Sequence, residues 1–150
     1  MKRVVPAVVL VLLGVWISRF VPQTPHPNGY AERTRLAIEQ TLGEVATAGL
    51  VLRNLQDETL PWAYASVTLR SSSASLATTA GSYAEVFPPS GSEDPATRTR
   101  ALIGQAEDAV TATRLVVSRQ DRGRLPAMMT ELHDLTGRLQ TLDDELEPAG

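Results

Sequence analysis

A leucine-based repeat near the C-terminus is the feature that most restricts the fold of this chain. Apolar residues follow one another there at alternating spacings of three and four: Leu125, Met128, Leu132, Leu135, Leu139, Leu142 and Leu146. This spacing places them along one side of an α-helix, which has about 3.6 residues per turn. A helix with one apolar side needs other helices to cover it. The repeat therefore predicts a helix that packs in a bundle.

Three earlier segments show the same spacing. The first runs from about Tyr30 to Gln56 behind a cap at Asn28-Gly29, and its apolar positions are Ile38, Leu42, Val45, Gly49 and Leu52, widened by Leu36, Leu50 and Leu55. The second follows Pro61 and carries Trp62, Ala65, Leu69, Ser72, Leu76, Thr79, Tyr83 and Val86. The third starts at the capping residue Asp94, with Pro95 at its first position, and carries Leu102 or Ile103, Ala106, Val110, Thr113 and Val117.

Short breaks separate these segments, at residues 57–61, 87–92 and 121–124. The serine-rich centre of the second segment, residues 71–75, has modest helix propensity, but the apolar period continues through it and favours a helix. We therefore expect an all-α fold, an antiparallel up-down-up-down four-helix bundle over residues 29–147 with a short tail at 148–150. The sustained heptads also permit a coiled coil between two chains, so a homodimer stays open.

The N-terminal residues 1–21 are typical of a membrane segment. Lys2 and Arg3 precede an uncharged run from Val4 to Ser18, and Trp16 and Phe20 near its end suit a membrane interface. We expect residues 4–21 to contact lipid as a signal-anchor or transmembrane helix, with the N-terminus in the cytoplasm and the bundle outside. The alternative is a cleaved signal peptide and a secreted protein, although the residues after the run form a poor cleavage site.

Residues 22–28, which include three prolines, are predicted to be a stiff, extended spacer between the membrane and the bundle. Beyond residue 21 the chain has 11 arginines and 17 acidic residues, a formal charge of −6 that argues against binding to nucleic acid. Because the sequence has no cysteine, disulfides, thiolate metal sites and lipid attachment through cysteine are excluded. The preference for arginine over lysine is typical of GC-rich bacterial genomes.

The sequence offers no residues in a pattern that supports catalysis. His133 falls between the buried positions Leu132 and Leu135, so it is expected to face solvent. Its helical neighbours three and four residues away include no usual metal ligand. The paired carboxylates, such as Glu107-Asp108, point about 100° apart on a helix and do not form an acid–base couple. We therefore predict a non-enzymatic protein with no catalytic, cofactor-binding or metal-binding residue.

An antiparallel bundle brings the first and third turns to one end. We expect Arg53, Arg119, Arg122 and Arg124 there, near Asp57, Glu58 and Asp121, while most other acids collect at the opposite end. Together with the exposed Tyr64, these arginines are candidate contacts for an acidic protein or an anionic envelope polymer. Compensation of helix dipoles and ordinary solubility explain the same charges without a partner. The sequence thus predicts an extracytoplasmic accessory module of the cell envelope, and the alternative is a small-ligand sensor or carrier.

Overall fold

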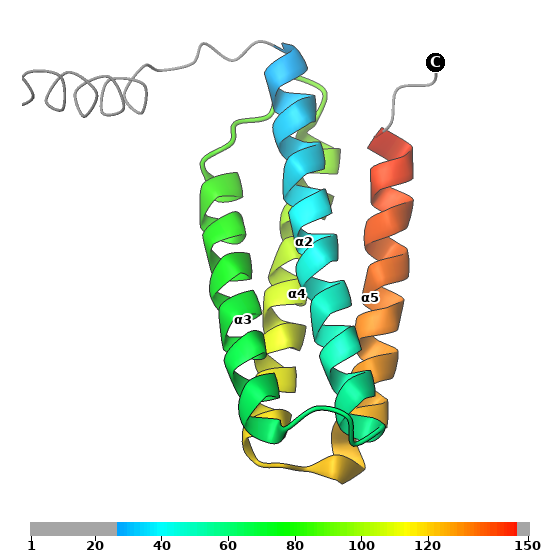
Figure 1. Ribbon diagram of the computed structural model, residues 1–150. Coiled ribbons are helices and arrows are strands. Elements are labelled where there is room, and N and C mark those ends of the chain that lie inside the picture. Colours follow the sequence, from blue (N-terminus) through cyan, green and yellow to red (C-terminus); the bar gives the residue numbers. More distant parts are fainter. Residues whose placement is uncertain (1–26, 147–150) are drawn as a thin grey trace, which may run out of the picture.

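The computed structural model describes residues 27–146, which form four α-helices and no strand (Figure 1). The helices are α2 (Pro27–Gln56), α3 (Trp62–Ala84), α4 (Glu93–Ser118) and α5 (Leu125–Leu146), and a short 3-10 helix, η1 (Arg122–Arg124), precedes α5. The expected membrane segment 1–21, most of the spacer and the tail lie outside the described residues. Within 27–146, none of the helices is both long enough and apolar enough to cross a membrane.

Each helix packs beside the next, and α5 returns to pack beside α2, so the four form a closed ring. The first and third turns lie at one end, which we call the tip, and the α3–α4 connection lies at the other end together with Pro27 and Leu146 (Figure 1). The antiparallel four-helix arrangement predicted from the sequence is confirmed. Diagonal contact occurs chiefly between α2 and α4.

The core lies on the predicted sides of the helices. In α5 the buried residues are Leu125, Met128, Leu132, Leu135, Leu139 and Leu142, which are the positions of the repeat. The serine-rich centre of α3 is helical, and the buried residues of that helix also follow the prediction: Ala65, Leu69, Ser72, Leu76, Thr79 and Tyr83. Both candidates on α4, Leu102 and Ile103, are buried.

Two leucines of α2 were wrongly assigned to the core. Leu36 and Leu50 are 52% and 58% exposed, because both lie on the side of α2 that faces away from the bundle. The inward side is completed instead by small residues, including Ala48 and Thr41, both fully buried. Thr41 Oγ1 donates a hydrogen bond to its own helix, to the Ala37 carbonyl at 2.7 Å, so that the hydroxyl is buried without leaving a polar atom unpaired.

Two helix starts also differ from the prediction. α4 begins at Glu93 with Ser92 as its N-cap, not at Asp94, so Pro95 occupies the third helical position. Proline is tolerated there because the first N–H groups of a helix have no partner within it. α2 begins at Pro27, which places two residues of the predicted spacer in the helix. The fixed φ of proline suits the first position of a helix.

Candidate functional site: the tip

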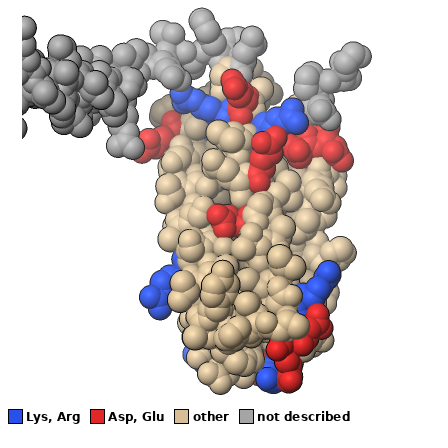
Figure 2. Space-filling model, in the orientation of Figure 1, with Lys and Arg blue, Asp and Glu red and all other residues tan. Residues whose placement is uncertain are grey.

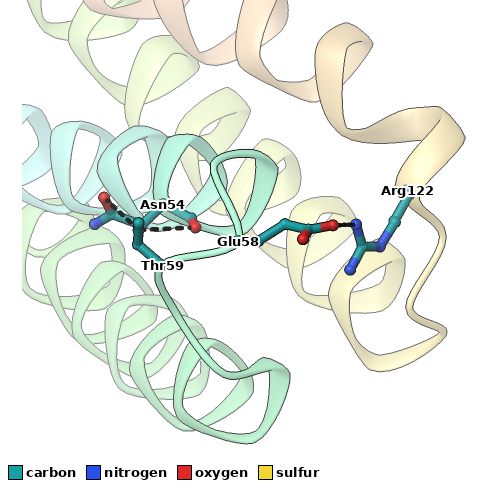
Figure 3. Close-up of polar contacts among 4 residues, drawn as sticks. All are labelled: Asn54, Glu58, Thr59 and Arg122. Atoms are coloured by element: carbon teal, nitrogen blue, oxygen red, sulfur yellow. Dashed lines mark hydrogen bonds and ion pairs between the residues drawn. The ribbon is translucent and has the colours of Figure 1, made fainter.

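The first turn of the tip ends α2 with a Schellman motif. The Thr59 N–H donates to the Asn54 carbonyl at 2.9 Å, and the Glu58 N–H donates to the Leu55 carbonyl at 3.2 Å. Thr59 Oγ1 also donates to the Asn54 carbonyl, at 3.1 Å (Figure 3). This geometry requires a left-handed residue at Glu58, whose φ is +58°. Glycine usually occupies this position, so the turn is built at a conformational cost.

The third turn ends α4 with the same motif. The Asp121 N–H donates to the Val116 carbonyl at 3.1 Å, and the Gln120 N–H donates to the Val117 carbonyl at 3.0 Å. Gln120 is left-handed, with φ +53°. Glu58 and Gln120 are the non-glycine residues with positive φ in the part of the chain that the structure describes, and both lie at the tip. The two turns therefore have the same backbone conformation, a Schellman motif with a left-handed, non-glycine residue.

Arg122 joins the two turns. Its guanidinium forms an ion pair with the Glu58 carboxylate, from 64 residues earlier in the chain (Figure 3). The same guanidinium lies over the ring of Trp62, 5.8 Å from the ring centroid. The predicted grouping of Arg122 and Glu58 at one end is thus a direct contact. The role of Trp62 as a second partner of Arg122 was not predicted, since the period of α3 assigned Trp62 to the core alone.

The other predicted contact residues are exposed. Arg119 is the C-cap of α4 and Arg124 ends η1. Neither forms an ion pair within 4.0 Å inside residues 27–146. Tyr64, in the first turn of α3, is 63% exposed. Arg53 lies in the last turn of α2, at the tip end as predicted, and its side chain also lines a groove between α2 and α5 together with Leu50, Met129 and His133.

On the face of the bundle seen in Figure 2, charged side chains are sparse over the middle and gather toward the two ends. The end opposite the tip carries acids from α4 and α5, as expected: Glu93, Asp94, Asp143, Asp144 and Glu145. An ion pair between Arg98 and Glu145, 2.7 Å long, ties α4 to α5 there. At the tip, Arg119 and Arg124 lie with the acids Asp57, Glu58 and Asp121, while a larger group of acids lies at the opposite end.

A tyrosine pair near the start of α2 was not foreseen. Tyr83, at 3% exposure, shares a hydrogen bond with Thr34 Oγ1 at 3.1 Å, and its hydroxyl lies 3.5 Å from that of Tyr30. Desolvation by burial, followed by the hydrogen bond with Tyr83, raises the pKa of Tyr30 to about 12. Arg100 caps the Tyr83 ring at 5.9 Å and donates to the Val86 carbonyl at 2.8 Å. These contacts fasten α2, α3 and α4 together.

The surface between α2 and α3 holds two adjoining hollows of about 390 and 520 Å³. Gln40, Thr78 and Thr79 line both hollows, and Leu36 and Tyr83 line only the smaller one. Both hollows are open to solvent. Thr79 Oγ1 lies 3.3 Å from Gln40 Oε1 across the junction and 3.1 Å from the Ser75 carbonyl oxygen of its own helix, and its hydroxyl can donate to either.

The structure does not bring His133 and the carboxylates of residues 27–146 together into a metal site. His133 is exposed on α5, as predicted. Among residues 27–146, no three His, Asp or Glu side chains are grouped so that they could hold a metal ion. Comparison of the chain with protein families, curated proteins and solved structures gives no match.

Proposed function

We propose that this chain is a non-enzymatic interaction module of the cell envelope that binds an acidic protein surface through its tip. The observation that carries the proposal is the pair Arg119 and Arg124, two exposed arginines at the tip that have no ion-pair partner within residues 27–146. Arginine presents a planar fork of donors that suits carboxylates. A tip of fixed shape binds at a lower entropic cost than a mobile loop.

The construction of the tip supports this proposal. Both turns bend at a left-handed, non-glycine residue, and the Glu58–Arg122–Trp62 contact joins them. Strained backbone often marks places where shape matters for function. Tyr64 and Val67, 63% and 65% exposed, add apolar surface one turn away. Arginine and tyrosine together are typical of protein interfaces, and this favours a protein partner over an anionic polymer.

The proposal includes a membrane anchor at residues 4–21, with the bundle outside the cytoplasm. Lys2 and Arg3 before the uncharged run of residues 4–18 support an N-terminus that stays in the cytoplasm. The test is cell fractionation combined with intact mass. Full-length mass in the membrane fraction supports the anchor. A mass that begins near Glu32, found outside the cells, would replace it with a secreted protein.

The tip is tested by capture of envelope proteins on the immobilised chain. Arg119→Glu/Arg124→Glu should abolish specific capture, whereas Arg70→Glu/Arg138→Glu, which changes the net charge equally at exposed positions of the bundle body, should retain it. Arg122 is left unchanged because its removal would disturb both turns. Equal capture by the two variants would reject the tip. Binding that is insensitive to Tyr64→Ser but competed by a soluble polyanion would indicate a polymer instead.

A further inference from the structure

The outward side of α2 carries a row of exposed residues that no helix of the bundle covers. The row comprises Arg35, Glu39, Gly43, Ala46, Leu50, Arg53 and Asp57. Successive members are three or four residues apart, so the row follows one side of the helix along most of its length. α3 and α5 flank α2 on either side and leave this row open.

The charges of this row are arranged symmetrically about Ala46. Arg35 and Asp57 lie eleven residues from it in opposite directions, and Glu39 and Arg53 lie seven residues from it. Within each pair the two charges are opposite. A second α2 placed antiparallel, with a two-fold axis at Ala46, would therefore set each charge against its opposite in both copies. A self-complementary patch of this kind is what a two-fold dimer requires.

The centre of the row is uncharged and has room for close approach. A Cβ atom at Gly43 would meet nothing within 4 Å, so the chain's own packing does not require glycine there. Glycine in a helix costs about 1 kcal/mol relative to alanine. Leu50 is 58% exposed on the same row. In the antiparallel arrangement Leu50 falls over Gly43 of the second copy, where the missing side chain leaves space for it.

We infer that the outward side of α2 is a self-association surface whose occupant is a second, antiparallel copy of this chain. Leu50 of each copy packs over Gly43 and Ala46 of the other. The ion pair already present between Arg35 and Glu39, 3.0 Å long, extends into a row of four alternating charges with Asp57 and Arg53 of the second copy. Because these groups are exposed, added salt should weaken the dimer.

This inference does not rest on the proposed function of the tip, but it bears on the orientation of the bundle. Pro27 lies nineteen residues from Ala46, so the two α2 starts would be about 57 Å apart at opposite ends of the dimer. Two chains anchored in one membrane could then pair only with their bundles lying along its surface. A bundle that stands upright on its anchor would be a monomer.

The test uses charge-exchange variants of the full chain in mild detergent. Arg35→Glu/Glu39→Arg and Arg53→Glu/Asp57→Arg each keep the net charge at −3 and leave residues 1–26 unchanged. Each variant alone opposes like charges in the antiparallel dimer, and its dissociation constant, measured by analytical ultracentrifugation, should rise roughly tenfold or more. An equimolar mixture of the two restores every opposite pair and should dimerise like the wild type.

The direction of pairing is tested by cross-linking, because the chain has no cysteine of its own. Glu39→Cys and Arg53→Cys chains should form a disulfide-linked heterodimer when mixed under oxidising conditions, and neither should cross-link efficiently alone. Efficient self-linking of each variant would indicate parallel pairing and overturn the inference. A monomeric wild type, or charge-exchange variants that dimerise as well as the wild type, would overturn it too, since self-association would then be absent or would not use this row.

Discussion

Replacing Gln120 by glycine should stabilise the bundle. Gln120 sits in the left-handed region at φ +53°, where a residue with a Cβ pays about 1 kcal/mol that glycine does not. Part of this gain is lost because glycine is more flexible in the unfolded chain. The net gain in the free energy of unfolding is about 0.5–1 kcal/mol. For a domain of this size it raises Tm by roughly 2–5 °C.

Glu58→Gly provides the matched comparison at the first turn. Its backbone gain is the same, since φ at Glu58 is +58°, but the substitution also removes the ion pair with Arg122. Both side chains of that pair are more than half exposed, so the pair contributes only about 0.2–1 kcal/mol. Glu58→Gly should therefore stabilise less than Gln120→Gly, or not at all.

The assay is urea and thermal unfolding of the full chain, followed by far-UV circular dichroism in one detergent. Gln120→Ala is the control: it keeps the left-handed cost and should change the free energy of unfolding by less than about 0.5 kcal/mol. An unchanged or lower stability of Gln120→Gly would refute the reasoning, because the Schellman motif at the end of α4 would then carry no strain for glycine to release.

Two further predictions concern the core and the tyrosine pair. Leu139→Ala should lower the free energy of unfolding by about 2–5 kcal/mol, since Leu139 is fully buried. Leu36→Ala should lower it by well under half of that, because Leu36 is 52% exposed. Equal losses in urea unfolding would place Leu36 in the core. Tyr30, with its pKa raised to about 12, stabilises the fold below pH 10 and loses that contribution as pH rises from about 10 to 12, because the unfolded tyrosine ionises first. Ultraviolet titration should show Tyr30 ionising at higher pH than a free tyrosine in the wild type and closer to it in Tyr83→Phe.

The periodicity of the sequence predicted the helices well because it depends only on the angle between successive residues. It placed each buried residue of α5 and found Thr79 and Thr113 among the buried positions. The prediction failed where residues were assigned to the core because they are leucines and not because of their angular position on the helix. Leu36 and Leu50 were assigned inward as leucines, although Leu50 lies on the opposite side of α2 from the fully buried Leu52 and Leu55.

At the tip, too, some features were predictable from the sequence and others were not. Antiparallel topology was enough to bring Glu58 and Arg122 to one end. Their contact was not predictable, because it depends on the left-handed backbone at Glu58, and a glutamate there carries no sequence signal for that conformation. The tyrosine pair was missed for a related reason. Tyr30 and Tyr83 are 53 residues apart and meet only through the register of α2 against α3.

Arg53 lies close to both proposed surfaces, the tip and the row on α2. It lies in the last turn of α2, at the tip as predicted, and its side chain lines the groove between α2 and α5 on the row that we assign to self-association. Arg35→Glu/Glu39→Arg changes the same row in the half of α2 away from the tip, so it should weaken the dimer while a tip-bound partner is retained, and Arg119→Glu/Arg124→Glu should do the reverse. If both variants lost both kinds of binding, the tip and the α2 row would act as one surface, formed only in the dimer. In that case the partner would be recognised by a pair of chains, and the free arginines alone would not suffice.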